Sequence, residues 1–330
     1  MEGMPATPFH NSDAWFRAWR DAYMPATARE YTLDGMTLLS EARRFGPIRF
    51  RCLRSFTNLH TIRLDLPPGA SGRPAPCAGD WDSIEIAYLP ADCPLVAAAR
   101  SWGRRVHCDV FARAPVTDCR RPFASWLAGR SKRDRRRWLK LERDLIDGAG
   151  MTFAVEQDGS DTVLAEVLAL EAAGWKGRNG SAIRNSAADT LFYTRIWHAA
   201  AAAGKLRVAT LRHRGRLVAF EYGLLGGDRL FVPKASFDEA WAAQSPGHVL
   251  AMLHIRACCD DPAIGCYDVL GNGLTPAAHK MRFADRLDDL YRVRIYGAGW
   301  RGTLLWTVAS ARRGAKRLRD RWRAARAVAA

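Results

Sequence analysis

Three titratable side chains stand where acid–base chemistry could use them. Glu221 lies inside the predicted strand VAFEYGLL, opposite in phase to its aromatic neighbours, so it faces either solvent or a cleft in which it could accept a proton. Asp268 lies in an otherwise apolar strand, where it is either a proton acceptor or a structural acid bonded to loop amides. Since imidazole ordinarily titrates near neutrality, His279 could donate a proton, unless it is an ordinary surface histidine. The candidate catalytic residues are Glu221, Asp268 and His279.

A second feature is a helix start that suits an anion. Residues 244–249 lead into a predicted amphipathic helix, in which Ser245 is a good N-cap and Pro246 suits the first helical position. Gly247 removes the side chain where a ligand would approach the backbone. Such an N-terminus offers amides and a positive dipole end to a phosphate, although the same residues also begin many ordinary core helices. The candidate anion-binding residues are Gln244, Ser245, Pro246, Gly247, His248 and Val249.

A Gly-rich stretch, GWKGRNGSA at 174–182, could hold a polar ligand. Trp175 would stack on a sugar and Lys176 would supply a charge; the alternative is a core tryptophan beside a solvated lysine. Lys280, further along the chain, could bind an anionic group or pair with Asp268. The candidate substrate-binding residues are Trp175, Lys176, Gly180 and Lys280.

The positive charge of the chain is concentrated in two segments. The 330 residues carry a formal charge of +16, of which residues 301–330 hold +8, from nine basic residues against Asp320. Residues 130–144 hold +5, from eight basic residues against three acids. The hydrophobic content of 48% with 12 Trp excludes a globally disordered chain. The segment at 130–144 is either a solvated basic face or a contact for an acidic ligand.

The basic C-terminal segment reads as an amphipathic helix over 301–326, interrupted at Gly314. Leu304, Leu305, Val308, Leu318, Trp322 and Ala325 can share one side of it. This pattern is typical of a helix that lies on an anionic membrane surface, which we expect as a partner. Non-specific nucleic-acid binding would use the same charges and is the less favoured reading, and a frayed soluble tail is the third.

The cysteines favour a reduced compartment. None of the eight forms a CxxC pair, and no histidine stands at a zinc-like spacing to two of them, so we expect no metal. No signal peptide is visible at the start and no apolar run is long enough to span a bilayer. We expect a cytoplasmic protein, peripheral at the inner face of the membrane if the tail binds there.

The predicted elements fall into two mixed α/β units joined by a basic helical bridge. The first unit has strands at 48–53, 60–66, 83–89 and 106–111, helices at 13–23 and 94–102, and a loop at 67–80. The bridge, at 123–146, reads as a long helix or a helix pair. The second unit follows with strands at 151–155, 206–211, 217–225, 230–232, 266–270 and 290–295 and helices at 161–173, 187–203, 246–258 and 275–283. Because a helix links the strands at 230–232 and 266–270, we expect these two strands to be parallel neighbours. The predicted domains are 1–120, 121–150, 151–298 and 299–330.

Three stretches of the second unit carry a resemblance to a known family. They are EAAGWKGRNGSA at 171–182, SPGHVL at 245–250 and YDVLGNGLTPAAHKMRF at 267–283. With the order of elements, they resemble the GNAT acyltransferases, in particular CelD/BcsL-type proteins of exopolysaccharide and cellulose biosynthesis, which are similar to the FemABX aminoacyl transferases. The resemblance covers roughly 123–296 and implies an α/β (α+β, mixed-sheet) GNAT fold, with the first unit as a degenerate GNAT-like half.

The resemblance implies acyl-CoA as the donor, with its pyrophosphate at the amides of Gly247, His248 and Val249. It also implies that amides of the splayed strand near 232–235 stabilise the oxyanion. Two departures stand out. The usual pyrophosphate signature is richer in glycine, and His279 stands where the family pattern has a tyrosine before Lys280.

Three hypotheses follow. The first is transfer of an acyl group, with acetyl expected, from acyl-CoA to an amine or hydroxyl of a saccharide or other small cell-envelope precursor. The second is a FemABX-like transfer from aminoacyl-tRNA, in which the basic bridge contacts RNA. The third is a GNAT-shaped, membrane-associated binding protein without catalysis.

Overall fold

The computed structural model describes residues 7–33, 35–66, 81–101 and 105–328. The chain divides into two compact units, one formed by residues 1–24 and 112–289 and the other by residues 25–111 and 290–330. We call these unit 1 and unit 2. Two long strands, β5 (Val106–Asp118) and β11 (Arg286–Tyr296), contribute residues to both. The predicted loop at 67–80 lies outside the described residues.

Unit 1 is built on a mixed sheet with the strand order β5-β10-β9-β8-β7-β6. Its strands are β6 (Met151–Glu156), β7 (Leu206–His213), β8 (Arg216–Gly226), β9 (Arg229–Phe237) and β10 (Cys266–Asp268). All neighbours pair antiparallel except β9 and β10, which are parallel, as the sequence predicted. Arg214 and Gly215, both with positive φ, form the tight turn between β7 and β8.

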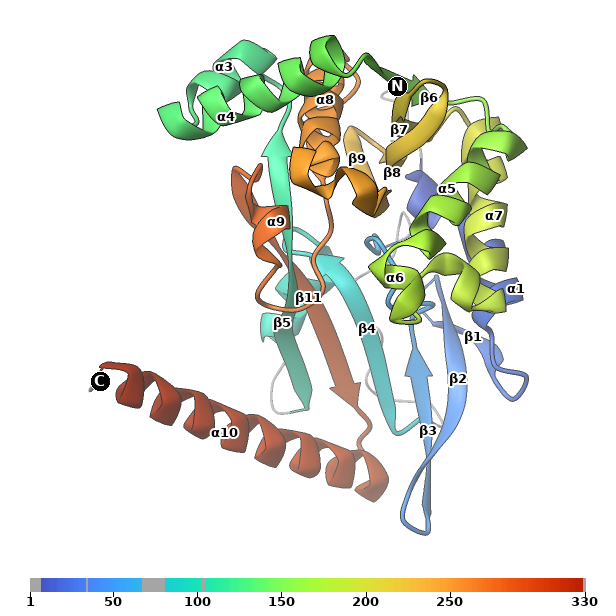
Figure 1. The fold of residues 1–330 in the computed structure, drawn as a ribbon. Coiled ribbons are helices and arrows are strands. Elements are labelled where there is room, and N and C mark those ends of the chain that lie inside the picture. The colour runs from blue at the N-terminus through green and yellow to red at the C-terminus, as the bar shows by residue number, and fades with distance from the viewer. Residues whose placement is uncertain (1–6, 34, 67–80, 102–104, 329–330) are drawn as a thin grey trace, which may run out of the picture. The chain divides into compact units, whose positions relative to one another are not determined.

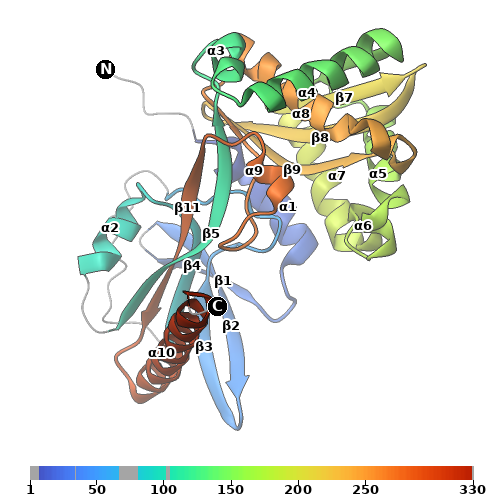
Figure 2. The same cartoon turned by 60° about the vertical axis from the view of Figure 1, so that its left-hand side comes forward.

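Helices cover both faces of the unit 1 sheet, as Figure 2 shows. One face carries α5 (Asp161–Ala173) and α7 (Ala187–Ala202), against which α1 (Asp13–Tyr23) packs. The other face carries α8 (Pro246–Asp260), flanked by α3 (Phe123–Ala128) and α4 (Lys132–Arg143). The predicted bridge is thus a helix pair, ending in a π-helical turn at Asp144–Gly148. Two short helices, α6 (Trp175–Arg178) and α9 (Ala278–Met281), complete the layers.

The core of unit 1 explains why α8 lies where it does. Val249, Leu250 and Leu253 of α8 are buried against apolar side chains of β7 and β8. Further along, Met252 and Ile255 join a second apolar cluster with Trp126 and other side chains of the helix pair. Burial of this amphipathic face, rather than helix propensity, fixes α8 against the sheet and so positions its N-terminus.

Unit 2 has its own hydrophobic core around a second group of strands. Its strands run β1 (Arg29–Leu33), β2 (Met36–Phe45), β3 (Ile48–Arg54), β4 (Ser83–Pro90) and β11, with β3 and β4 parallel and the other pairs antiparallel. Helix α2 (Pro94–Ser101) packs Leu95 and Val96 into this core. The long helix α10 (Trp300–Val328) ends the chain (Figure 1).

Four predicted details are wrong. Residues 60–66 are not a strand, and β1 and β2 were missed because their charged residues hide the alternation. The Gly-rich stretch 174–182 contains a helical turn, α6, and is not purely a loop. Helix α10 runs through Gly314 without a break, since one glycine costs a helix only about 1 kcal/mol.

Among the described residues, no helix is long and apolar enough to cross a membrane.

Candidate active site

The two parallel strands of unit 1 separate after a short pairing. Cys266, Tyr267 and Asp268 pair with Arg229, Leu230 and Phe231, and there β10 ends. Strand β9 runs on to Phe237, still paired to β8. The backbone of β9 from Val232 onward therefore lies beside a gap in the sheet, as predicted for the splayed strand. Pro233 has no N–H, so any oxyanion donor there must come from the other amides of 232–235.

Asp268 fixes the end of β10. Its carboxylate is buried and accepts hydrogen bonds from Arg229 Nη1 at 2.9 Å and from the amide of Leu270 at 2.8 Å. Arg229 also binds Asp288. Burial raises the pKa of Asp268, whereas Arg229 and the amide act in the opposite direction. These contacts are those of the structural acid that the sequence left open; a role as proton acceptor stays a prediction.

Lys280 and His279 follow on α9. Lys280 Nζ donates to the carbonyl oxygens of Val269 and Leu270 at 2.8 and 2.9 Å, so it ties α9 to the segment after β10. Burial lowers the pKa of Lys280. His279 is exposed, and burial of part of its ring, together with nearby Lys280 and Lys176, lowers its pKa. A neutral imidazole at pH 7 would have to pick up a proton before it could donate one.

A buried carboxylate with two lysines lies on the other side of the gap. Glu171, at the end of α5, is 0% exposed and accepts a hydrogen bond from Lys176 Nζ at 3.2 Å and from the amide of Ile183 at 2.8 Å. Lys234 Nζ of β9 lies 3.8 Å from the same carboxylate, over the ring of Tyr193. Burial lowers the pKa of Lys234, and Lys176 acts in the same direction while Glu171 opposes it.

This arrangement places an ammonium group on the open part of β9. Lys176 Nζ also donates to the carbonyl oxygen of Ala235 at 2.6 Å. Two lysines and one carboxylate leave a net positive charge, which can hold an anionic group. An amine with a lowered pKa, such as that of Lys234, also gives up its proton more readily than an ordinary lysine.

Trp175 begins α6 and Gly180 lies in the turn that follows it. Trp175 is 52% exposed, so it is not the core tryptophan that the sequence allowed and its ring is available for stacking. Its amide donates to Glu239, which also binds Arg178 through both oxygens and so holds α6 in place. Gly180 is exposed with φ +72°, a turn position that favours glycine.

Glu221 is part of a buried polar network and not of the open gap. Its carboxylate lies 2.8 Å from Nδ1 of His254 on α8 and accepts the hydroxyl of Tyr267 at 2.9 Å. All three residues are buried. The expectation that Glu221 faces solvent or a cleft is therefore wrong, because its side of β8 is covered by α8. Its role as a base stays a prediction.

Helix α8 begins where the sequence predicted, but Ser245 does not cap it through its side chain. Pro246 is the first helical residue, but Ser245 has φ 55° and its side chain makes no capping bond. The amides of His248 and Val249 donate to the carbonyl of Ser245 at 3.0 and 3.4 Å, the latter a long bond. Gln244 is exposed, whereas Pro246 and Val249 are buried. A Cβ at Gly247 would lie 3.3 Å from the ring of Phe237, so packing is one reason for glycine here.

Cations surround this helix start. Burial and the nearby charges of Arg282, Arg137 and His279 lower the pKa of His248 to about 4. Arg282 Nε is buried and, within the described part of the chain, has no hydrogen-bond partner. An unpaired guanidinium nitrogen and a positive helix end, both close to His248, favour an anion.

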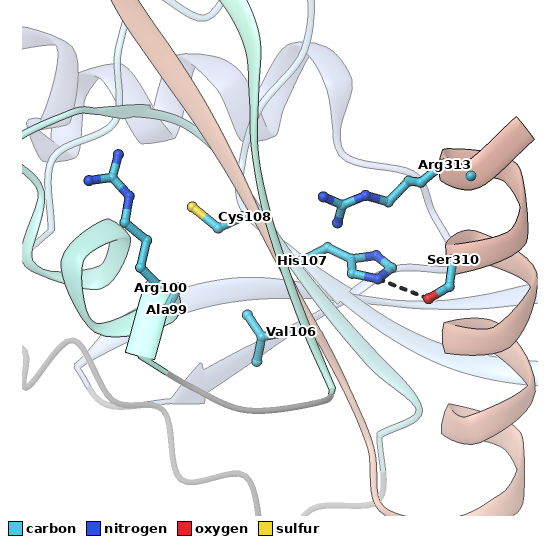
Figure 3. A pocket seen from close by; sticks show the side chains of 8 residues that line it. Ala99, Arg100, Val106, His107, Cys108, Ser310 and Arg313 are labelled. Atoms are coloured by element: carbon cyan, nitrogen blue, oxygen red, sulfur yellow. Dashed lines mark hydrogen bonds between the residues drawn. The ribbon is translucent and has the colours of Figure 1, made fainter. Parts of the chain in front are cut away.

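A separate cavity of about 470 Å³ lies in unit 2 (Figure 3). Its lining includes Arg100, His107 and Arg313. Arg100 donates to Tyr291 and Arg313 pairs with Asp109. The imidazole of His107 contacts Ser310 at 3.1 Å and Tyr296 at 3.2 Å. Since these polar groups already have partners, we place the candidate active site in unit 1.

Several residues of the site were missed by sequence reasoning. Glu171 was recognisable as an acid on the apolar face of α5. Lys234 interrupts an apolar strand in the same way. His254 and Tyr267, in contrast, read as core residues, and the position of Arg282 depends on how α9 packs against α8.

Comparison with known proteins identifies the domain that carries this site. Residues 128–281 match the family model described as acetyltransferase (GNAT) domain. This range contains α8, the gap between β9 and β10, and the Glu171 cluster. The chain thus carries a GNAT domain in a mixed α/β fold, and the predicted fold class is confirmed. We find no significant match among curated proteins.

Solved structures support the fold over most of the chain. The C-terminal domain (DUF2156) of a putative lysylphosphatidylglycerol synthetase from Agrobacterium fabrum is similar with a TM-score of 0.52 and 11% identity, covering 91% of this chain and 93% of that one. A conserved protein of unknown function from Bacteroides thetaiotaomicron has a TM-score of 0.52 and 12% identity, and the match covers 87% of this chain and 92% of that one. FemX has a TM-score of 0.51 and 10% identity, and the match covers 84% of this chain and 90% of that one. At these identities the likeness shows a shared fold alone.

Proposed function

We propose that the protein transfers an acyl group from acyl-CoA directly to an amine or hydroxyl at the gap between β9 and β10. The acyl group is expected to be acetyl. The acceptor is an exopolysaccharide or other cell-envelope precursor, as the sequence resemblance to CelD/BcsL-type proteins implies. The exposed ring of Trp175 supports a saccharide acceptor, since aromatic faces stack on sugars.

The observation that carries this proposal is the electropositive N-terminus of α8. Arg282 and Arg137 approach His248 closely enough to depress its pKa, and Arg282 Nε lacks a partner among the described residues. A diphosphate would supply the negative charge that neutralises this group of cations. The residues that would hold it are Arg282, Arg137 and the amide of Gly247, since the amides of His248 and Val249 already donate to Ser245.

From that anchor the thioester would lie beside the open part of β9. The acceptor nitrogen or oxygen attacks the thioester carbonyl and loses a proton, the C–S bond breaks, and the CoA thiolate takes up a proton. The products are the amide or ester and free CoA. Lys234, Asp268 and Glu221 are the proton acceptors to test, with His279 as the donor to the thiolate.

A second candidate is transfer of an aminoacyl group from tRNA. It is favoured by α4, whose exposed arginines include Arg133, Arg136 and Arg137. A row of exposed cations binds the phosphate backbone of RNA without a need for diphosphate. Under this candidate Arg137 would contact RNA and Arg282 would have no role.

Titration of the full-length protein with different donors separates these candidates. Acetyl-CoA, longer acyl-CoAs and aminoacyl-tRNA are each titrated by calorimetry, and release of free CoA thiol is followed with amino-sugar acceptors. Saturable binding of a CoA ester supports the proposal. Binding of tRNA that weakens steeply with salt, without binding of CoA esters, supports the second candidate. If neither a CoA ester nor aminoacyl-tRNA binds, the protein is a GNAT-shaped binding protein without acyl transfer.

A further inference from the structure

The outer side of helix α10 in unit 2 carries an apolar stripe. Trp300, Leu318 and Trp322 are 63%, 68% and 58% exposed. At about 100° per residue, these three side chains fall within an arc of about 40° around the helix. Large apolar side chains aligned and exposed along one helix face mark a surface for interaction.

The inner side of the same helix is attached to unit 2. Ser310 contacts His107, and Arg313 pairs with Asp109 of β5. Figure 3 shows both side chains directed from α10 toward the strand that carries His107. By the helical repeat, Leu318 and Trp322 lie about 140° and 180° around the helix from Arg313. The stripe therefore points away from the body of the unit.

Cations flank the stripe. Arg312 and Lys316 are exposed and lie about 80° and 120° around the helix from Trp322, with Arg319 between them and the stripe. Over the whole segment 301–330 the sequence has nine basic residues against one acid. An apolar stripe beside a cationic flank is the pattern of a helix that lies in the plane of a membrane surface.

We propose that α10 docks unit 2 on an anionic lipid bilayer surface, with Leu318 and Trp322 among the acyl chains and the flanking cations at the headgroups. An anionic bilayer would bind both the apolar stripe and the flanking cations of α10. Nucleic acid would use the charges and leave Leu318 in water, and a second copy of α10 would bring like charges together. The inference is independent of the reaction proposed for unit 1.

Vesicle co-sedimentation of the full-length protein tests this inference. Vesicles of phosphatidylcholine with about 30% phosphatidylserine are compared with pure phosphatidylcholine, where binding should be much weaker. The double variant Arg312→Gln with Lys316→Gln should bind anionic vesicles about 25-fold more weakly, since each cation near the surface contributes about fivefold. The matched control, Arg44→Gln with Arg49→Gln, removes two exposed cations from the β2–β3 hairpin of the same unit and should change binding little.

The apolar stripe is tested separately. Leu318→Ser with Trp322→Ser should weaken vesicle binding at least about 100-fold. Leu59→Ser removes an 80% exposed leucine of unit 2 outside α10 and should leave binding unchanged. Circular dichroism checks that each variant is folded.

Three outcomes would overturn the inference. One is absence of binding to anionic vesicles. The second is salt-sensitive RNA binding that persists in the Leu318 and Trp322 variant, together with no binding of vesicles by the native protein. The third is dimerisation in solution that this variant abolishes, which would assign the stripe to a second copy of the chain.

Discussion

Single residues in the candidate site show how burial and charge are balanced. Glu171 has no exposure to solvent and compensates two lysines, Lys176 and Lys234, that reach the open part of β9. A buried carboxylate of this kind is costly unless it is paired and hydrogen-bonded, and Glu171 is both. Its role is to hold two ammonium groups at a position where an anionic acceptor group could meet them.

Replacement of Glu171 by Gln should destabilise the protein by about 2–4 kcal/mol, because two partly buried ammonium groups lose their counter-ion. Equilibrium urea unfolding measures the loss. The matched control is Glu166→Gln on the same helix, which breaks the half-exposed pair with Arg212 and should cost under about 1 kcal/mol. Equal losses in the two variants would show that the Glu171 cluster contributes no more than a surface ion pair.

His248 should make stability depend on pH. Its pKa is lowered to about 4 in the folded protein from an ordinary 6.5, so the unfolded chain takes up a proton first as the pH falls. The contribution of this histidine is fully present above pH 6.5 and is lost progressively down to about pH 4. Because the ring is only half-buried, we expect a loss of about 1 kcal/mol between pH 7 and pH 5.

Comparison of the free energies of unfolding at pH 7 and pH 5 for the native protein and His248→Gln isolates this contribution. The native protein should lose about 1 kcal/mol more than the variant over that interval. An equal loss in both would contradict a depressed pKa at His248. Ligand anions at α8 should reduce the difference, because they favour the charged imidazole.

At the scale of elements, short segments set the distances within the site. Helix α6 folds back closely on α5, and this contact places Lys176 beside Glu171. Gly177 makes the approach possible, since a Cβ there would lie 1.8 Å from the carbonyl oxygen of Ala172. The glycine is therefore a packing requirement of the α5–α6 corner.

Gly177→Ala should cost about 2–3 kcal/mol, because the backbone of α6 must move away from α5. Gly180→Ala is the comparison: it has open space around it and suffers only from φ +72°, at a cost of about 1 kcal/mol. Thermal unfolding of the two variants measures both effects. The account of the corner fails if Gly177→Ala is as stable as Gly180→Ala.

The sequence predicted the elements that carry regular apolar patterns. Strand β7 and the helix between β9 and β10 stand out by periodicity, and β8 and β9 contain short apolar runs. The parallel pairing of β9 and β10 follows from the crossover. Strands β1 and β2, rich in Glu and Arg, do not. The side of β8 to which Glu221 belongs was not predictable either, because a strand buried on both faces loses its alternation. The electrostatic effect of Arg282 on His248 depends on tertiary packing that no local pattern encodes.

At the scale of the whole molecule, the two units carry different chemistry. Unit 1 holds the GNAT domain with an electropositive helix N-terminus and a gap in the sheet. Unit 2 holds its own hydrophobic core and the basic helix α10. Its interpretation as a second, degenerate GNAT-like unit stays a prediction, as do the domain boundaries.

The most direct test of the account is the affinity for acetyl-CoA of the native protein and of Arg282→Gln, measured by calorimetry. We predict saturable binding that weakens about 10- to 100-fold in the variant, since a charge-assisted hydrogen bond contributes about 1.5–3 kcal/mol. Arg136→Gln, an exposed arginine of α4, is the control and should bind as the native protein does. Unchanged affinity in Arg282→Gln, or no binding of acetyl-CoA to the native protein, would contradict a diphosphate site at the start of α8.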